Sequence, residues 1–280
     1  MVTSAWLDAI QVDANQGNHR VHKQWIADLE AQYSATRDLN NPNVALEGFH
    51  AVKHALRFGV TPTSVVSPDP AAIDVLAAEL APDIRDELNG LITEISATDF
   101  ARLSPRGPSS PIVAIGPRRR ADIAEMFQPR HDRHIVVLEN PRHTGNAGAV
   151  IRVAAAANAV GVVTVGELDP WSSPVLRGAA GLHYALSVAS IEHSRDIPPH
   201  HRPLVALDPE GQDILSGAIP HNAALLFGTE RHGLSQELRD RASATFRLPM
   251  RPGVSSLNLA TAVSAALFML QAPHNAPHNQ

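Results

Sequence analysis

The chain has 280 residues, of which 44% are hydrophobic and 18% are charged, and its formal net charge at pH 7 is −5. This composition is typical of a globular protein with a sizeable core and excludes global disorder. The absence of cysteine excludes a disulfide framework, a thiolate nucleophile and a Cys-ligated zinc. The N-terminus is unlike a secretory signal and no apolar stretch is long enough to cross a membrane, so we expect a soluble, cytoplasmic protein.

Two domains are expected from the distribution of apolar residues and turn signals. Residues 1–40 form an extension with one expected helix, over 22–33, and with no role that the sequence assigns. Alternating helices and strands then predict a small α/β domain over 41–117. Its helices are expected over 50–58 and 71–80, and its strands over 64–67, 91–95 and 112–115.

The segment 118–133 is expected to be a linker, and it belongs to an arginine-rich stretch. Between Arg102 and Arg133 there are seven arginines and three acidic residues. Because affinity for a phosphate backbone depends on Lys and Arg, this stretch is either an RNA-facing surface or a solvated linker. The candidate RNA contacts are Arg106, Arg118, Arg119 and Arg120, together with Arg142 further along the chain.

From residue 134 to residue 272, short runs of Val, Leu and Ile alternate with helices. This pattern predicts a mostly parallel sheet with both faces covered, in which ligands bind at the carboxyl ends of the strands. Strands are expected over 135–138, 162–165, 186–188, 204–207 and 224–227, and helices over 147–159, 173–178 and 258–270. Residues 273–280 are expected to be a disordered tail.

The first cluster of candidate functional residues is Asn140–Arg152, between an expected strand and the helix that follows. Gly145 and Gly148 permit a tight turn, and the side chain of Asn146 is placed to cap the helix. Arg152 lies on a largely apolar helix, where a charged group needs a partner. Two alternatives remain open here, a capped helix with a surface arginine and a dinucleotide site, although the G-x-G-x-x-G pattern is absent.

The second cluster is Leu225–Ser235, another apolar strand that runs into a loop between two glycines. Gly228 and Gly233 permit close approach of the backbone to a ligand, Glu230 is a carboxylate between them, and Ser235 is an expected helix cap. A plain turn from strand to helix is the alternative.

The third cluster is Leu248–Ala260, in which prolines and a glycine hold an extended loop after a short strand. Ser255, Ser256 and Asn258 are expected to open a helix that is apolar nearly all round, so this helix is buried in the core or against another subunit. Its N-terminal amides would favour an anion in an enclosed site, although each polar residue alone could be simple capping.

The three clusters read N-x-G-x-x-x-R, F-G-x-E-x-x-G-L-S and L-P-M-x-x-x-V-x-S-L-N-L-A, in this order. Together they resemble the three motifs of the SpoU/TrmH family of RNA 2′-O-ribose methyltransferases, in the SPOUT superfamily. Upstream, Leu46–Leu56 is similar to the start of the small substrate-binding domain of that family, which shares its fold with some ribosomal proteins.

The resemblance implies an α/β fold with a C-terminal trefoil-knotted domain, an exception to the rule against knotted chains. It implies S-adenosylmethionine as cofactor, ribosomal or transfer RNA as substrate with ribosomal RNA slightly favoured, and a homodimer formed through the C-terminal domain. The residues implied in catalysis and substrate orientation are Asn146, Arg152, Glu230, Ser256 and Asn258. Those implied in cofactor binding are Leu207, Gly228, Thr229, Gly233, Leu248, Met250, Leu257 and Ala260.

A ribose 2′-hydroxyl is a weak nucleophile, so it needs a base or strong hydrogen bonding and in-line placement on the methyl group. Arg152 would assist deprotonation or stabilise the developing oxyanion, and because a guanidinium normally stays protonated, charge stabilisation is the simpler role. An alternative of another class is a non-catalytic RNA-binding or ribosome-assembly factor. The scattered histidines show no spacing typical of a metal site, and neither a metal nor a membrane partner is expected.

Overall fold

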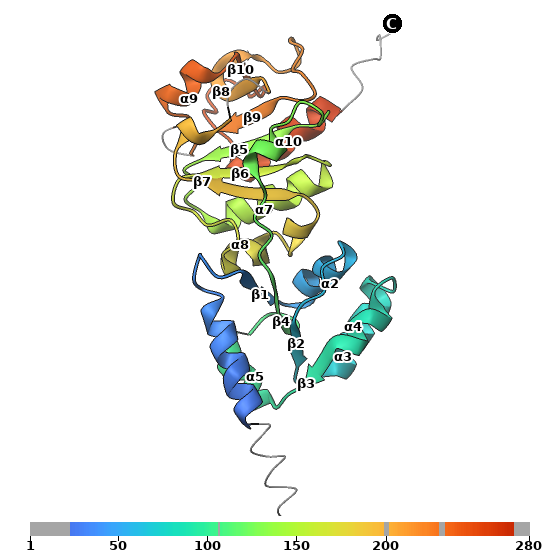
Figure 1. Ribbon diagram of the computed structural model, residues 1–280. Helices are drawn as coiled ribbons and strands as arrows, with labels where there is room; N and C mark the ends of the chain where they lie inside the picture. Colours follow the sequence, from blue (N-terminus) through green and yellow to red (C-terminus); the bar gives the residue numbers. More distant parts are fainter. Residues whose placement is uncertain (1–22, 106, 199–201, 230–232, 272–280) are drawn as a thin grey trace, which may run out of the picture.

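The computed structural model describes residues 23–105, 107–198, 202–229 and 233–271. These residues form two β-sheets, one above the other in Figure 1, and the chain passes from the first sheet to the second through residues 118–134. The expected extension 1–22 and tail 273–280 lie outside the described residues.

The first sheet has four strands in the order β1-β4-β2-β3 and is mixed. β4 pairs antiparallel with both β1 and β2, and β2 pairs parallel with β3. The strands are β1 (Asn43–Glu47), β2 (Ser64–Ser67), β3 (Ile92–Glu94) and β4 (Val113–Pro117), and the helices are α2 (Phe49–Arg57), α3 (Pro70–Leu80), α4 (Arg85–Leu91) and α5 (Ala97–Leu103).

Helices cover both faces of this first sheet (Figure 1). α2, α3 and α4 lie on one face, where their side chains share a core with Val44, Leu46 and Val65. α5 and a helical segment over residues 23–35 lie on the other face, in a separate core with Val66 and Ile115. The N-terminal helix, to which the sequence assigned no role, is therefore part of the first α/β unit.

The second sheet has six strands in the order β10-β8-β9-β5-β6-β7, and every pair is parallel. Every residue of β5 and β6 is buried, which is why these strands are mostly apolar in the sequence, with Glu139 and Thr164 as the polar exceptions. The strands are β5 (Ile135–Glu139), β6 (Gly161–Val165), β7 (Ser187–Ile191), β8 (Leu204–Asp213), β9 (Ala224–Phe227) and β10 (Ala244–Arg247).

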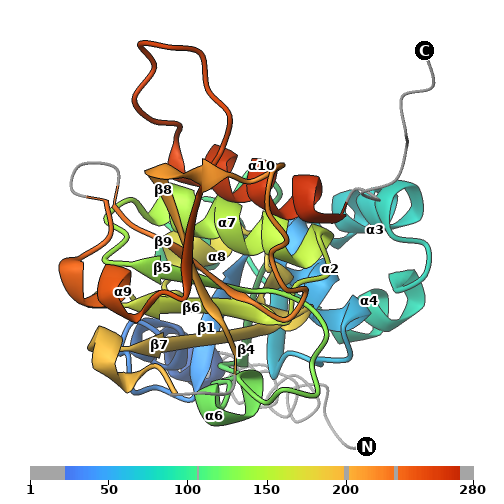
Figure 2. The same ribbon diagram turned by 90° about the horizontal axis from the view of Figure 1, so that it is seen from above.

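One face of the second sheet carries α7, α8 and α10, and the other carries α6 and α9. Viewed from above in Figure 2, α10 and α7 lie side by side across the sheet. The helices are α6 (Ile123–Met126), α7 (Thr144–Ala156), α8 (Ser173–Gly178), α9 (Gln236–Arg241) and α10 (Leu259–Gln271), with short 3₁₀ helices η1 (Leu182–Tyr184) and η2 (Ser194–Asp196).

A buried ion pair joins the linker to the second sheet. The Arg118 guanidinium donates to both carboxylate oxygens of Asp169, at 2.9 and 3.0 Å, and its side chain is only 4% exposed. The prediction that Arg118 contacts RNA therefore conflicts with its placement, because its side chain is enclosed between the two sheets.

Most expected elements are present within one or two residues of their expected bounds, and the prediction of a mostly parallel sheet is confirmed. Two strands, 64–67 and 224–227, match their expected bounds. The sequence reading missed β1, α4, α5 and α6, and it ended β8 at residue 207 although the strand continues to Asp213. The trefoil knot and the domain boundaries remain predictions.

Candidate active site

A cavity of about 230 Å³ lies at the carboxyl end of β9, beside the part of β8 that follows its pairing with β9, at the edge of the sheet where α/β proteins usually bind ligands. Three segments build it: residues 207–209 of β8, the glycine turn after β9, and the loop between β10 and α10. The residues that line it are Leu207, Asp208, Pro209, Phe227, Gly228, Thr229, Gly233, Leu248, Met250, Ser255, Ser256, Leu257, Leu259 and Ala262.

The turn after β9 closes on itself. The amide of Thr229 donates to the carbonyl of Gly233 at 3.2 Å, and the amide of Gly233 donates back at 3.0 Å. A Cβ on Gly228 would lie 2.0 Å from the carbonyl carbon of Gly233, so no other residue fits there without moving the turn. The second motif therefore needs glycine at position 228 for close packing of the backbone against itself.

Asn258 links the first and third motifs. Its Oδ1 accepts from the amides of Ala260 and Thr261, at 2.9 and 3.4 Å, which caps α10. Its Nδ2 donates to the side-chain oxygen of Asn146 at 3.1 Å. Two asparagines that are 112 positions apart in the sequence are thus brought together at the N-termini of α7 and α10.

The expected starts of two helices are wrong, and so is the expected enclosure of the site. α7 begins at Thr144, so Asn146 lies inside its first turn, and the side chain at the N-cap position, His143, makes no capping hydrogen bond. Ser255 and Ser256 precede α10, which begins at Leu259. Residues 251–258 are exposed, so the loop that was expected to enclose the site is open in the single chain.

Seven of the eight residues expected to bind the cofactor line the cavity. The exception is Ala260, whose neighbours Leu259 and Ala262 line it instead. The sequence reading missed Asp208 and Pro209, which directly follow the end of the expected strand 204–207. A polar residue at the carboxyl end of a parallel strand is the signal that identifies such positions.

The residues expected to act in catalysis are only partly brought together. Ser256 lines the cavity, and Asn146 contacts Asn258 at its edge, but neither Asn146 nor Arg152 is among the lining residues. Arg152 is exposed on α7. Glu230 lies outside the described residues.

A second hollow, of about 370 Å³, adjoins the cavity and shares Thr229 and Gly233 with it. Arg142 is exposed at its wall, and Glu139 lies at its base with only 5% exposure. The Glu139 carboxylate accepts from the amide of Ser235 at 2.7 Å, which joins β5 to the start of α9. The sequence reading missed Glu139, although it is a carboxylate at the end of a wholly buried strand.

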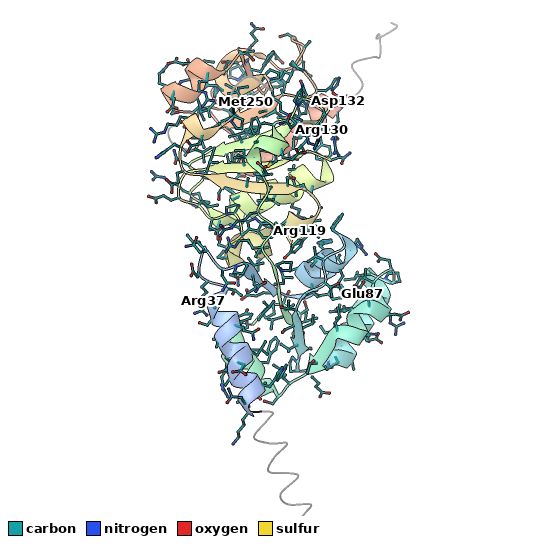
Figure 3. The ribbon with its side chains drawn as sticks, in the orientation of Figure 1. Arg37, Glu87, Arg119, Arg130, Asp132 and Met250 are labelled. Carbon is teal, nitrogen blue, oxygen red and sulfur yellow. The ribbon has the colours of Figure 1, made fainter. Side chains whose placement is uncertain are left out.

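The remaining candidate arginines differ in their surroundings. Arg119 and Arg120 are exposed, and the Arg119 guanidinium lies 5.9 Å from the centre of the Tyr184 ring. Both line a hollow of about 500 Å³, together with Arg133. In Figure 3, Arg119 lies where the two sheets meet, far from Met250 at the opposite end of the second sheet. Arg106 lies outside the described residues.

No group of His, Asp and Glu side chains within the described ranges is arranged to hold a metal ion. In these same ranges, no helix has the length and apolar character needed to cross a membrane.

Residues 133–268, which include all six strands of the second sheet, match the SpoU rRNA Methylase family. The chain thus carries a methylase domain of the SpoU family, as its three motifs indicated, and the parallel sheet with its cavity belongs to that domain.

Individual relatives agree with this assignment. An uncharacterized tRNA/rRNA methyltransferase of Synechocystis sp. is 32% identical over 149 residues, which are 50% of this chain and 53% of that protein. The 23S rRNA (uridine(2479)-2′-O)-methyltransferase of Streptomyces viridochromogenes is 26% identical, and the alignment covers 69% of each chain. The crystal structure of an AdoMet-bound rRNA methyltransferase from Sinorhizobium meliloti superimposes with a TM-score of 0.67 and 26% identity, over 88% of this chain and 93% of that one. The match to the Synechocystis protein spans only about half of its length.

Proposed function

We propose that this protein transfers a methyl group from S-adenosylmethionine to a ribose 2′-hydroxyl in structured RNA, with ribosomal RNA as the favoured substrate. The observation that carries the proposal is the cavity at the carboxyl end of β9, which the second and third motifs line together. The relatives named above include rRNA methyltransferases, one of them a 2′-O-methyltransferase and one with bound AdoMet. A non-catalytic role is therefore not favoured.

The lining of the cavity suits S-adenosylmethionine. Leu207, Phe227 and Leu248 offer apolar surface for the adenine ring, and Thr229 and Ser256 offer hydroxyl groups for the polar ribose and amino-acid ends. When bound, the cofactor supplies a methyl group on a positively charged sulfur, which makes the methyl carbon open to attack by an oxygen nucleophile.

The residues of the first motif would act on the ribose. Arg152 would stabilise the negative charge that develops on the 2′-oxygen as its proton leaves, because a guanidinium stays protonated at neutral pH. Asn146 and Asn258, already joined at 3.1 Å, would orient the ribose, together with Ser256 and Glu230. Arg152 thus stabilises charge and is not the base, so the proton of the 2′-hydroxyl passes to solvent or to another base.

We propose that the active site is completed in a homodimer. Arg152 and Asn146 do not line the cavity of their own chain, and the loop 251–258 at its mouth is exposed. Phe268 of α10 is 47% exposed, although α10 is apolar along most of its length. A second copy packed on α10 would cover Phe268 and bring a second α7 towards the cavity.

We also propose that the first α/β unit binds the RNA substrate, and that the exposed Arg119, Arg120 and Arg142 contact its backbone. Arg118 is no longer included, because its charge is already paired with Asp169. The domain limits 41–117 and 134–272, with a linker at 118–133, and the cytoplasmic location remain predictions.

The proposed reaction is tested by incubating the protein with ribosomal RNA and S-adenosylmethionine that carries a labelled methyl group. After digestion to nucleosides, the label is expected on the 2′-oxygen of one nucleotide type. Label on a base would contradict the reaction type, and the absence of label from both ribosomal and transfer RNA would contradict the function.

The shared active site is tested by mixing two inactive variants, Arg152→Ala and Gly228→Ala. If each site takes Arg152 from one chain and the cavity from the other, half of the randomly mixed dimers contain one intact site, and about a quarter of the wild-type activity returns. Should the mixture stay inactive while a dimer forms, the site would lie within one chain.

A further inference from the structure

We propose that His50 and Lys53 of α2, together with Arg152 of α7, form a binding site for a phosphodiester of the RNA substrate. The two helices belong to different sheets, so one bound phosphate would tie the RNA to both α/β units. The identity of the anion as an RNA phosphate rests on the proposed function, whereas the preference for an anion rests on the side chains themselves.

Lys53 has an unusual environment for a lysine. It is only 8% exposed, and it is one of two lysines in a chain that otherwise uses arginine as its cation. Within the described ranges it has no hydrogen-bond or ion-pair partner. A covered cation without a partner is costly, so the fold is expected to keep it only where an anion from outside neutralises it.

The acidic residue nearest to this cluster is already engaged. Asp83 accepts from the Arg57 guanidinium at 2.8 and 2.5 Å, in a two-point ion pair on the exposed side of α2. The charge of Arg57 is therefore largely paired, whereas Arg152 has no ion-pair or hydrogen-bond partner among the described residues. Neither Lys53 nor Arg152 therefore has an ion-pair partner of its own among the described residues.

Close packing of the backbone sets the distance between α2 and α7. A Cβ on Gly181 would lie 2.7 Å from the Cα of Ala51, so α2 is seated directly on the turn that follows α8. A Cβ on Gly148 would lie 2.8 Å from the Cα of Gly178, so α7 is in turn seated on α8. Arg152 is one helical turn after Gly148 and shares its face of α7. The short helix η1 contacts both α7 and α2, so the two helices are held against the same segment.

His50, Lys53 and Arg152 influence one another electrostatically across this contact. Burial lowers the pKa of Lys53, and the neighbouring charges of Arg57 and Arg152 lower it further, against an opposing effect of Asp83. Burial also lowers the pKa of the exposed-face His50, with further contributions from Lys53 and Arg152. Positive charges that disfavour one another in this way would be stabilised together by a single anion.

His50, Lys53 and Arg57 are spaced three and four residues apart, so they share one face of α2. His50 is exposed and, with a lowered pKa, is mostly neutral at pH 7 and can donate one ring N–H. An ammonium, an imidazole N–H and a guanidinium together offer charge and several donors, which matches the oxygens of a phosphodiester.

A purely structural role is the competing explanation for Lys53, because a lysine stem also covers apolar surface. The variant Lys53→Met separates the two explanations, since it keeps the stem and removes the charge. The other lysine of the chain, Lys23, is exposed on the N-terminal helix, and Lys23→Met is the matched control.

RNA affinity is measured for the full-length variants by filter binding at a series of salt concentrations, with ribosomal RNA as the probe. Lys53→Met is expected to bind about fivefold to tenfold more weakly and to reduce the slope of log K against log salt by about one. Lys53→Arg is expected to restore both values, and Lys23→Met to leave them unchanged. Wild-type affinity and slope in Lys53→Met, with unchanged thermal stability, would overturn the proposal.

The two lysines also permit a direct measurement. Reductive ¹³C-methylation retains the charge of each lysine and gives a separate NMR signal for Lys23 and Lys53. On titration with inorganic phosphate and then with a short oligouridylate, the Lys53 signal is expected to shift saturably while the Lys23 signal stays in place. Equal response of both signals, or of neither, would contradict a built phosphate site.

These readouts do not require methyl transfer, so the two proposals can fail separately. If the protein methylates RNA but Lys53→Met binds RNA normally, the phosphate site is wrong and the function stands. If no methyl transfer occurs but Lys53 responds to phosphate and to RNA, the phosphate site stands and the function is wrong.

Discussion

The junction between the two sheets and the carboxyl-end edge of the second sheet differ in how fully one chain satisfies its polar groups. At the junction, Arg118 and Asp169 pair with little exposure, and His54 Nδ1 lies 2.6 Å from the carbonyl of Ala180. At the edge, residues 251–258 are exposed, and Arg152, on the helix α7 that begins at this edge, has no partner among the described residues. The Arg118–Asp169 pair of the junction is thus formed within one chain, whereas the edge presents an exposed loop and an unpaired arginine to a cofactor, an RNA and a second copy.

The largest expected effect concerns the open edge. Replacing Arg152 with alanine should lower kcat about 10²- to 10³-fold, which is typical for the loss of a group that stabilises charge in the transition state. Because Arg152 does not line the cavity, the affinity for S-adenosylmethionine in calorimetry should stay within about twofold. Near-normal methyl transfer by the variant would remove Arg152 from the mechanism.

The next effect concerns the junction. Arg118→Ala should lower the free energy of unfolding by about 3 kcal/mol, because it leaves the Asp169 carboxylate covered and without its cation. Arg120→Ala is the matched control, since Arg120 is exposed and donates only to the carbonyl of Leu39, and its cost should stay below about 0.5 kcal/mol. Urea denaturation measures both, and equal losses would mean that the junction is no more firmly held than the surface.

The cofactor cavity is tested at its glycine turn. Gly228→Ala should weaken S-adenosylmethionine binding about a hundredfold, because the added Cβ must displace the backbone of Gly233. Gly90→Ala is the control, since a Cβ there meets nothing within 4 Å. Calorimetry on both variants gives the comparison, and unchanged affinity in Gly228→Ala would place the cofactor elsewhere.

The smallest expected effect is a pH dependence at the junction. His183 is wholly buried, which lowers its pKa to about 4, and its Nε2 donates to the carbonyl of Pro170. Since the unfolded chain binds a proton near pH 6.5 and the folded chain does not, acidification from pH 7 to pH 5 should cost about 2 kcal/mol at this residue. Urea denaturation at pH 7 and pH 5 measures how much unfolding free energy each protein loses on acidification. The loss should be smaller in His183→Gln than in the wild type by about 2 kcal/mol, and an equal loss in both would exclude His183 as its source.

Local sequence patterns predicted the centre of the second sheet well because β5, β6 and β9 are wholly buried, and their short apolar runs are visible without tertiary information. The cavity lining was also predictable, since Gly228, Leu248 and Leu257 lie in motifs whose order resembles a known family. The short β1 strand and the short helices α4 and α6 were missed, because their patterns are too brief to have a recognisable period.

Contacts between distant segments could not be predicted from the sequence. Arg118 was read as an RNA contact because the sequence shows its charge but not Asp169, which lies 51 positions away and neutralises it. Asn146 was read as a helix cap, whereas its partner is Asn258 at the start of another helix. No local pattern singles out Lys53 in the sequence. Its burial and the electrostatic repulsion between Lys53 and Arg152 depend on how the two sheets pack together.

The most direct test of the methyltransferase assignment is the mapping of ribose 2′-O-methylation across ribosomal and transfer RNA in a strain from which this gene has been deleted. One methylated ribose should disappear, return with the wild-type gene, and stay absent with the Arg152→Ala variant. An unchanged ribose methylation pattern, or the loss of a base methylation instead, would contradict the account.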